Sequence, residues 1–121
     1  MKNELISRTK KFALDCWKLC SNIPKSREFN AYVHQLLKSS SSVGANYRAS
    51  QRAKSTADFI NKLKIVEEEA DESVYWLELF EEIVPEHKDE IHRLVKEGKE
   101  LLAIIVASIS TAKRNQSKNA K

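Results

Sequence analysis

The stretch SSSSVGANYRASQRAKS, residues 39–55, decides the fold, because it suits either a flexible linker or part of a long helix. Small and polar residues crowd its first half, as they do in linkers. Yet positions spaced by three or four residues run through it in one helical phase: Phe29, Val33, Leu36, Ser40, Val43 and Tyr47. A flexible segment has no reason to keep this phase, so we predict one helix over residues 27–52. A kinked or partly unwound segment is the alternative.

The middle of this predicted helix is narrow. Residues 39–42, Gly44 and Ala45 carry almost no side-chain bulk, so a neighbouring backbone can approach closely. Ser and Gly in a helix interior lower its stability by up to ~1 kcal/mol each relative to Ala. We therefore expect close packing against a neighbouring helix to offset that loss.

The composition favours one all-helical domain. The chain has 121 residues, of which 41% are hydrophobic, so it can bury one core. It contains only two Gly and two Pro, whereas a chain of short strands needs a turn signal about every 8–12 residues. We therefore exclude a β-rich fold.

Three further amphipathic segments accompany the helix over residues 27–52. Helical spacing of their apolar residues predicts helices over residues 3–21, 56–84 and 87–112. Pro24 and Pro85 lie in the breaks, where proline removes a backbone donor. Ser55, followed by Asp58 three residues later, is a helix N-terminal signature.

Four amphipathic helices with short links favour an antiparallel up-down-up-down four-helix bundle. We expect a single domain over residues 1–112. The basic segment 113–121 has no apolar stripe and is expected to be a disordered tail.

The chain has more apolar surface than one core requires. The run LLAIIVASIS, residues 101–110, is apolar on all sides, and the third helix carries a second apolar stripe. Surplus apolar surface is typical of a partner interface, so we predict a homo-oligomer. The expected interface residues are Ile65, Trp76, Leu79, Ile104 and Val106. A broad core with scattered exposure is the alternative.

Charge is divided sharply along the chain. Residues 1–54 carry eleven Lys and Arg against three acids, a balance of +8, and residues 55–112 carry six against fourteen, a balance of −8. The last nine residues add +4. The basic part favours contact with RNA or DNA. The alternatives are that complementary faces pair within or between subunits, or that the faces are merely solvated.

The predicted nucleic-acid contacts are the basic residues Lys10, Lys11, Lys18, Arg48, Arg52, Lys113 and Arg114. A second prediction concerns carboxylates on the packed side of the third helix, which need partners. We expect a structural polar network of Asn46, Tyr47, Arg48, Arg52, Glu69 and Glu72. A protein-interaction scaffold without nucleic-acid binding is the alternative function.

The sequence lacks the usual signatures of catalysis. Two glycines cannot build a phosphate-binding loop, and no Glu-x-x-His motif of a di-iron bundle is present. His34, His87 and His92 have no metal-like or triad-like company. We therefore expect no enzyme, no cofactor and no metal.

Cys16 and Cys20 lie one helical turn apart, a poor arrangement for a disulfide, so we predict two buried free thiols. The longest apolar run is far shorter than the ~20 residues of a membrane span. Residues 1–12, MKNELISRTKKF, show no signal-peptide core. We expect a cytoplasmic protein without a membrane partner.

The segment SVGANYRASQRAKSTADFINKLKIVEEEADESVYWLEL, residues 42–79, carries a family resemblance. Its GANYR, its Ser before DFI, its EEADES and its YWLEL resemble those of the bacterial 23S rRNA-intervening sequence proteins. That family is related to the accessory variability protein of diversity-generating retroelements. The first and last helices match in length and character more than in letters.

The resemblance implies a four-helix bundle that assembles as a ring, typically a homopentamer, with no known catalytic activity. The retroelement relatives are strongly basic, bind nucleic acid and work with a reverse transcriptase. This chain differs from them in its acidic third helix and its modest net charge of +4.

Overall fold

The structure is a computed structural model that describes residues 2–119, with side chains from Glu4 to Lys118. It contains four α-helices and one short 3₁₀ helix: α1 (Lys2–Ser21), α2 (Arg27–Ser50), α3 (Thr56–Ile83), η1 (Pro85–His87) and α4 (Lys88–Asn119). The described residues include no strand, so the prediction of an all-α fold is confirmed. Each of the first three helices begins within one residue of its predicted start.

Residues 39–50 are helical and residues 51–55 form the connection to α3, so the linker interpretation of the serine run is wrong. α2 passes through the serine run without a break, and its N-cap Ser26 accepts a hydrogen bond from the Phe29 amide at 3.1 Å. α2 ends at Ser50, so Arg52 lies outside it, in the connection to α3. Ser55 caps α3 through the Asp58 amide at 3.1 Å, as its sequence signature predicts.

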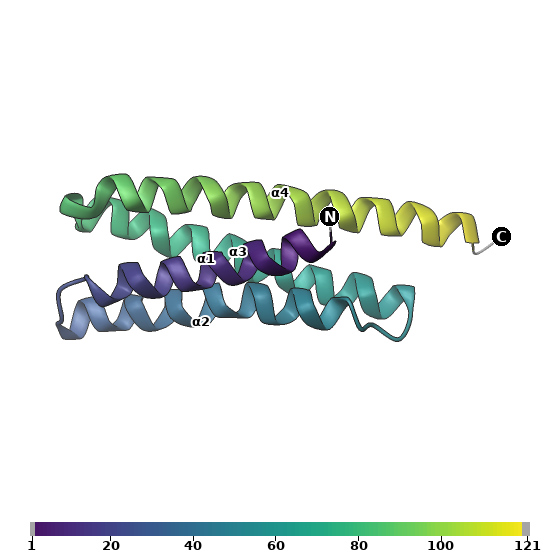
Figure 1. Cartoon of the computed structure of the whole chain (residues 1–121), viewed down its shortest axis with the longest axis horizontal. Helices are drawn as coiled ribbons and strands as arrows, with labels where there is room; N and C mark the ends of the chain where they lie inside the picture. Colours follow the sequence, from purple (N-terminus) through teal and green to yellow (C-terminus); the bar gives the residue numbers. More distant parts are fainter. Residues whose placement is uncertain (1, 120–121) are drawn as a thin grey trace.

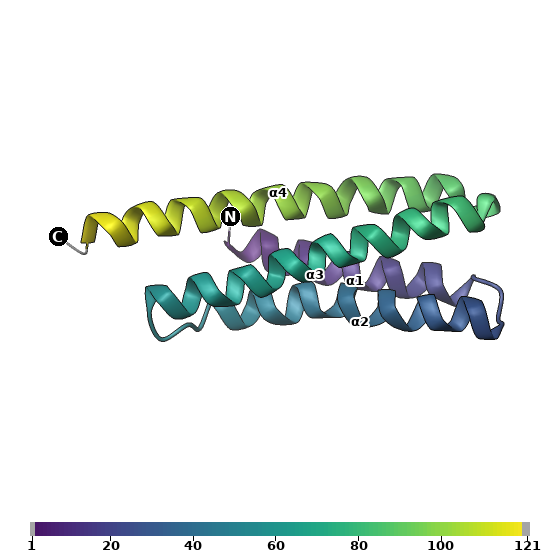
Figure 2. The ribbon, with the colours of Figure 1, turned by 180° about the vertical axis from the view of Figure 1, so that it is seen from behind.

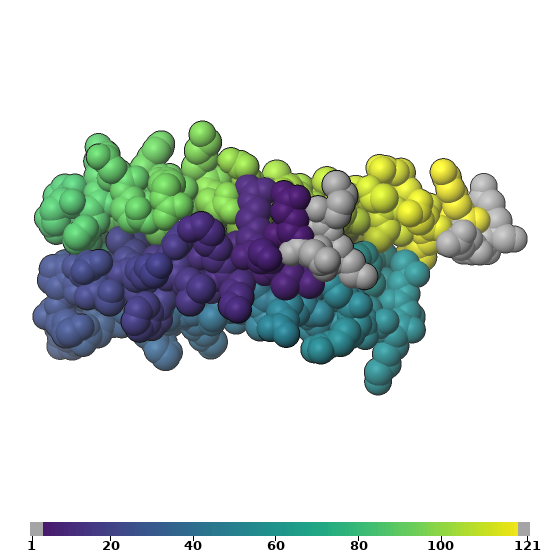
Figure 3. Space-filling model, in the orientation of Figure 1, coloured from purple at the N-terminus to yellow at the C-terminus, as the bar shows by residue number. Residues whose placement is uncertain are grey.

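The four helices lie side by side in an elongated bundle (Figures 1 and 2). The α1–α2 and α3–α4 connections lie at one end, and the α2–α3 connection lies at the other. α1 packs against α2 and, less extensively, against α4, while α3 packs against both α2 and α4. In Figure 3, α1 lies across the near face of the molecule, between α4 and α2.

α1 is too short to accompany its neighbours along their full length, so the bundle has two unlike halves. In the four-helix half, core residues come from all four helices: Phe12, Cys16, Leu36, Leu77, Phe80, Ile91, Leu94 and Leu101 are among them. In the three-helix half, the core comes from α2, α3 and α4: Val43, Tyr47, Ile60, Leu63, Val66, Ala70, Ile105 and Ile109. Of the apolar α1 side chains that the structure describes, Leu5 and Ile6 pack against this second core.

The C-terminal segment differs from the prediction. Residues 113–121 were expected to form a disordered tail, but α4 continues to Asn119, and the last two residues lie outside the described part. The segment KRNQSKN contains no proline or glycine, and Lys, Arg and Gln are good helix formers, so nothing in it ends the helix. The end of α4 extends past the α2–α3 connection (Figures 1 and 2).

The small residues of α2 allow close contacts with two neighbours. A Cβ atom added at Gly44 would lie 3.3 Å from Oγ1 of Thr9 on α1. On the α3 side, the buried hydroxyls of Ser39 and Ser73 form a hydrogen bond, with 2.9 Å between their oxygens. The predicted close packing at this stretch is therefore present.

The tightest glycine contact lies elsewhere and was not predicted. A Cβ atom at Gly98 of α4 would lie 2.8 Å from a methyl carbon of Val74 and 3.4 Å from the Phe12 ring. Gly98 thus lets α3 and α1 approach α4 at the same level. The sequence alone did not distinguish it from an ordinary position on the stripe of the last helix.

Candidate nucleic-acid interface

A groove between α1 and α2 brings two of the predicted basic residues together. It has a volume of about 440 Å³ and is lined by Ile6, Lys10 and Ala13 of α1 and by Ser41, Gly44, Ala45 and Arg48 of α2. Most of its other lining residues are small: Ala13, Ser41, Gly44 and Ala45. Lys10 and Arg48 are its charged residues.

The other predicted contacts lie apart from this groove. Lys18 lies near the end of α1 that leads into the α1–α2 connection. Arg52 lies in the α2–α3 connection, and Lys113 and Arg114 lie on the part of α4 that extends toward that end (Figure 1). The seven residues are therefore spread along the molecule.

Two of the seven are already engaged with other side chains. Lys11 Nζ forms an ion pair with Asp15 Oδ2 at 3.0 Å, and Arg114 donates to the Thr111 hydroxyl at 3.3 Å. Within the described part of the chain, the remaining five form no ion pair: Lys10, Lys18, Arg48, Arg52 and Lys113. Of the seven predicted contacts, these five are free to bind an external anion.

Ion pairs fasten α1 to α4 on the side away from the groove. The Arg8 guanidinium donates to both carboxylate oxygens of Glu97, at 2.7 and 2.8 Å, and to Glu100 at 2.8 Å. The hydrogen bonds to Glu97 contribute most to raising the pKa of Arg8. This bidentate geometry is the stronger form of a carboxylate pair.

Asp15 forms a second ion-pair contact between α1 and α4. Its carboxylate accepts from Lys11 and, at 3.2 Å, from Arg93 Nη2. Burial raises the pKa of Asp15, but the hydrogen bonds from the two cations outweigh it and leave the pKa below its usual value. The carboxylate is therefore held in its charged form.

The predicted polar network is not formed within one chain. No hydrogen bond or ion pair among the described side chains joins any two of the six proposed members. Asn46 donates to the Ser42 carbonyl at 2.8 Å, and Arg48 and Arg52 are exposed. The cation that lowers the pKa of Glu69 is Lys38 rather than Arg48 or Arg52. The buried polar contact between α2 and α3 is instead the Ser39–Ser73 pair.

Among the proposed members of the network, Glu69 is half-buried and Tyr47 is buried. Burial, with the neighbouring Glu72 charge, raises the pKa of Glu69, while Lys38 opposes the shift. Burial alone raises the pKa of Tyr47. Glu69 is therefore a carboxylate that the fold disfavours in its charged form.

The residues predicted for an oligomer interface lie on two helices, α3 and α4. Ile65 and Val106 are 40% and 42% exposed, and Trp76, Leu79 and Ile104 are half-buried. Trp76 packs against the core of the four-helix half and against Tyr32, with 5.3 Å between ring centroids. Its Nε1 is buried without a hydrogen-bond partner in the described part of the chain.

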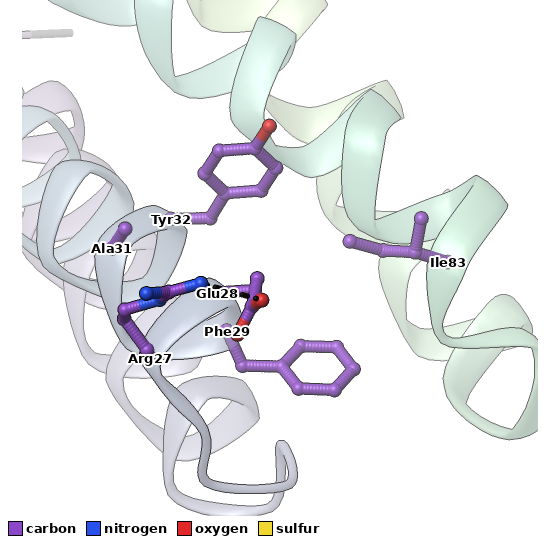
Figure 4. A pocket seen from close by; sticks show the side chains of 6 residues that line it. All are labelled: Arg27, Glu28, Phe29, Ala31, Tyr32 and Ile83. Atoms are coloured by element: carbon purple, nitrogen blue, oxygen red, sulfur yellow. Dashed lines mark hydrogen bonds and ion pairs between the residues drawn. The ribbon is translucent and has the colours of Figure 1, made fainter.

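An apolar pocket lies beside this aromatic pair, between α2 and α3. Figure 4 shows Phe29 and Tyr32 of α2 on one side and Ile83 of α3 on the other, with the Arg27–Glu28 ion pair at the rim. Its volume is about 500 Å³. Trp76 is among the residues predicted for an oligomer interface, and Tyr32 is not.

A second apolar groove lies in the three-helix half. It is lined by Phe59 of α3 and by Ile104, Ala107, Ser108, Thr111, Ala112 and Asn115 of α4, with a volume of about 520 Å³. On α4, Ile104, Ser108 and Thr111 continue the helical stripe of Glu97 and Glu100, which meet Arg8 of α1. We call this the α1-vacant groove, because it lies where a longer α1 would pack.

Other chemistry is sparse in the described residues. No group of three or more His, Cys, Asp or Glu side chains there is arranged to hold a metal ion. Cys16 and Cys20 are free and buried, as predicted; burial raises both pKa values, that of Cys20 to about 11, so both thiols stay protonated. Among the described helices, none is long and apolar enough to cross a membrane.

These features define a small helical-bundle protein with a basic groove and unpaired apolar surface. A model of the 23S rRNA-intervening sequence protein family matches residues 1–107. The chain therefore belongs to this family, and the resemblance inferred from residues 42–79 is confirmed.

A solved structure supports the assignment. The chain is similar to a protein of unknown function from the S23 ribosomal protein family of Bacteroides thetaiotaomicron, with a TM-score of 0.79 and 30% sequence identity. The match covers 87% of this chain and 97% of that one. No protein with a curated description matches.

Proposed function

We propose that this protein is a non-enzymatic, homo-oligomeric nucleic-acid-binding protein that contacts RNA or DNA through the α1–α2 side. In this proposal the chain is an antiparallel up-down-up-down bundle that assembles as a ring-like homo-oligomer. The family resemblance favours a pentamer, and the unpaired apolar surface supplies an interface.

The observation that carries nucleic-acid binding is the set of free cations on α1 and α2. Their few acidic neighbours are already engaged: Asp15 with Lys11 and Arg93, and Glu28 with Arg27. Lys10 and Arg48 share one groove that contains no acidic residue. A polyanion placed there would release its counterions without competing with internal ion pairs.

Assembly is supported by the exposed apolar surface. The α1-vacant groove leaves Phe59 and Ile104 half-exposed, and the pocket beside Tyr32 and Ile83 is apolar as well. A second subunit packed on either surface would bury side chains that the single chain leaves in water.

The test combines absolute mass with binding of a structured RNA. Size-exclusion chromatography with light scattering should give a multiple of 13.9 kDa. In fluorescence-anisotropy titrations, RNA affinity should fall steeply with salt. The slope of log K against log salt is negative, and the double variant Lys10→Gln/Arg48→Gln should make it less steep by about 2. Each phosphate contact contributes about 0.9 to its magnitude.

The matched control changes the same charge on the acidic half, in the variant Lys96→Gln/Lys99→Gln. Lys99 lies 3.6 Å from Glu78, and both lysines are exposed on α4. Equal losses in the two double variants would contradict a specific α1–α2 interface. Absence of RNA and DNA binding would favour the scaffold function, in which the assembly binds a protein such as a reverse transcriptase.

A further inference from the structure

The two tryptophans occupy opposite environments. Trp76 packs on the core and contacts two tyrosine rings, with centroids 5.3 and 5.1 Å from its own. Trp17 is 59% exposed, the highest value among the large apolar residues of the described chain, and no ring contact involves it. An indole left in water has a face available for a planar ligand.

Trp17 lies on the stripe of α1 that lines the basic groove. Ile6, Lys10 and Ala13 line that groove, and Trp17 follows them with helical spacing of four, three and four residues. Leu14, 51% exposed, lies in the turn between Lys10 and Trp17. The groove therefore continues along α1 onto an exposed aromatic face.

Cations lie on both sides of this tryptophan along α1. Lys10 precedes it by two turns and Lys18 follows it directly, and neither forms an ion pair within the described residues. Across the groove, Arg48 is exposed and likewise forms no ion pair with the side chains that the structure describes. Asp15, the acidic residue closest in sequence, is engaged with Lys11 and Arg93 on the α4 side.

We propose that the α1–α2 groove binds single-stranded nucleic acid, with phosphates at Lys10 and Arg48 and one base stacked on Trp17. This inference rests on the proposed function and specifies its ligand. An aromatic face flanked by cations is the arrangement that holds unpaired bases without reading their sequence. In a duplex each base face is already covered by its neighbours, so Trp17 would have nothing to stack on.

The experiment compares a fluorescein-labelled oligouridine with a duplex RNA of equal length. The full chain should prefer the single strand, and the oligouridine should quench tryptophan fluorescence. Trp17→Ala should weaken single-strand binding about tenfold, within the range of one base stack, and should leave duplex affinity within twofold. Trp17→Phe should restore most of the loss, because a phenyl ring also stacks.

Leu14→Ala is the matched control, since it removes an equally exposed apolar side chain from the same face without removing a ring. It should change neither affinity more than twofold. Circular dichroism and light scattering on each variant establish that the helices and the assembled mass are unchanged.

Three outcomes are distinguishable. Failure of the wild-type chain to bind either RNA would overturn the proposed function and this inference with it. Binding of both RNAs with equal affinity, unchanged by Trp17→Ala, would overturn the inference alone. Altered assembled mass in Trp17→Ala, with unchanged RNA affinity, would assign Trp17 to a subunit interface and also overturn it.

Discussion

The four-helix half and the three-helix half of this bundle are built from the same helices, yet they differ in what they leave exposed. Where α1 is present, apolar residues of α4 such as Leu94 and Leu101 are fully buried. Beyond the N-terminal end of α1, the core residues Ile105 and Ile109 are still buried, but Ile104 on the α4 stripe that faces α1 is half-buried, and Phe59 lines a groove beside it. The α1-vacant groove therefore lies in the half of the bundle whose core comes from α2, α3 and α4.

The stripe of α4 that faces α1 changes in character along the helix. Glu97 and Glu100 meet Arg8 of α1, and their stripe then becomes apolar and small at Ile104 and Ser108. A helical stripe that faces water usually consists of charged and polar residues. Beyond the N-terminal end of α1, this stripe of α4 changes from charged residues to apolar and small ones. Such a change is the pattern expected of a surface that packs against another helix.

The largest difference between the halves is expected from core truncation. Phe12→Ala removes a ring that is 1% exposed and should lower the free energy of unfolding by about 3–5 kcal/mol. Ile104→Ala in the α1-vacant groove should cost about 1 kcal/mol or less, because less of its surface is buried. Urea denaturation followed by circular dichroism measures both, and equal losses would show that the α1-vacant groove is as well packed as the core.

Ile104→Ala has a second readout in the assembled protein. If a neighbouring subunit fills the α1-vacant groove, light scattering should show a reduced mass at low protein concentration. Ser110→Ala is the control, since Ser110 is exposed on the same helix. An unchanged mass would assign the interface to another surface.

Two glycines give a smaller contrast, between the close contact of α4 with α3 and α1 at Gly98 and that of α2 with α1 at Gly44. Gly98→Ala should lower the free energy of unfolding by about 1–2 kcal/mol, because overpacking against the stiff Val74 side chain costs more than the gain in helix propensity. Gly44→Ala should change it by less than about 1 kcal/mol, because the Thr9 hydroxyl is slightly farther away and the propensity gain offsets the contact. The reverse order of stability losses in thermal unfolding would contradict a tighter contact at Gly98 than at Gly44.

The smallest expected effects come from two carboxylates, Asp15 and Glu69. Their contributions to the free energy of unfolding should depend on pH with opposite sign. The pKa of Asp15 is lowered, so its stabilisation is present above its unfolded value of ~3.9 and is lost as the pH falls through the folded pKa. The pKa of Glu69 is raised, so folding is favoured below ~4.3 and loses that contribution as the pH rises through the folded pKa.

Asp15→Asn should therefore destabilise the protein at pH 7, and Glu69→Gln should stabilise it slightly, each by about 1 kcal/mol or less. Both differences from the wild type should shrink on acidification to pH 3. Chemical denaturation at the two pH values measures them. The same sign for both variants at pH 7 would contradict the assigned environments.

Much of the fold was predictable from local patterns. The stripe from Phe29 to Tyr47 overrode the linker-like composition of the serine run, since apolar phase reports which side of a helix faces a core. Ser26 and Ser55 marked helix starts because a cap acts on amides two or three residues away. The segment after residue 112 was wrongly expected to be disordered, because a polar stretch of good helix formers carries no signal of where it stops.

The candidate site was predictable only in part. Charge counting along the chain correctly pointed to α1 and α2 as the basic half, but it did not reveal that Lys11 is paired while Lys10 is free. It also placed Arg48 and Arg52 with Glu69 and Glu72, which the fold does not join. Trp17 was not among the predicted contacts, and its exposure is seen only in the structure.

The sequence by itself determined the four helices, their buried stripes and the family, because these depend on residues close together in the chain. The tertiary structure alone decided where α1 stops relative to its neighbours, which cations remain free and which grooves stay open. These properties depend on axial alignment and on pairs such as Arg8 with Glu97, which are 89 positions apart. Helical periodicity records the direction a residue faces, and it carries no information about what lies at the same height on another helix.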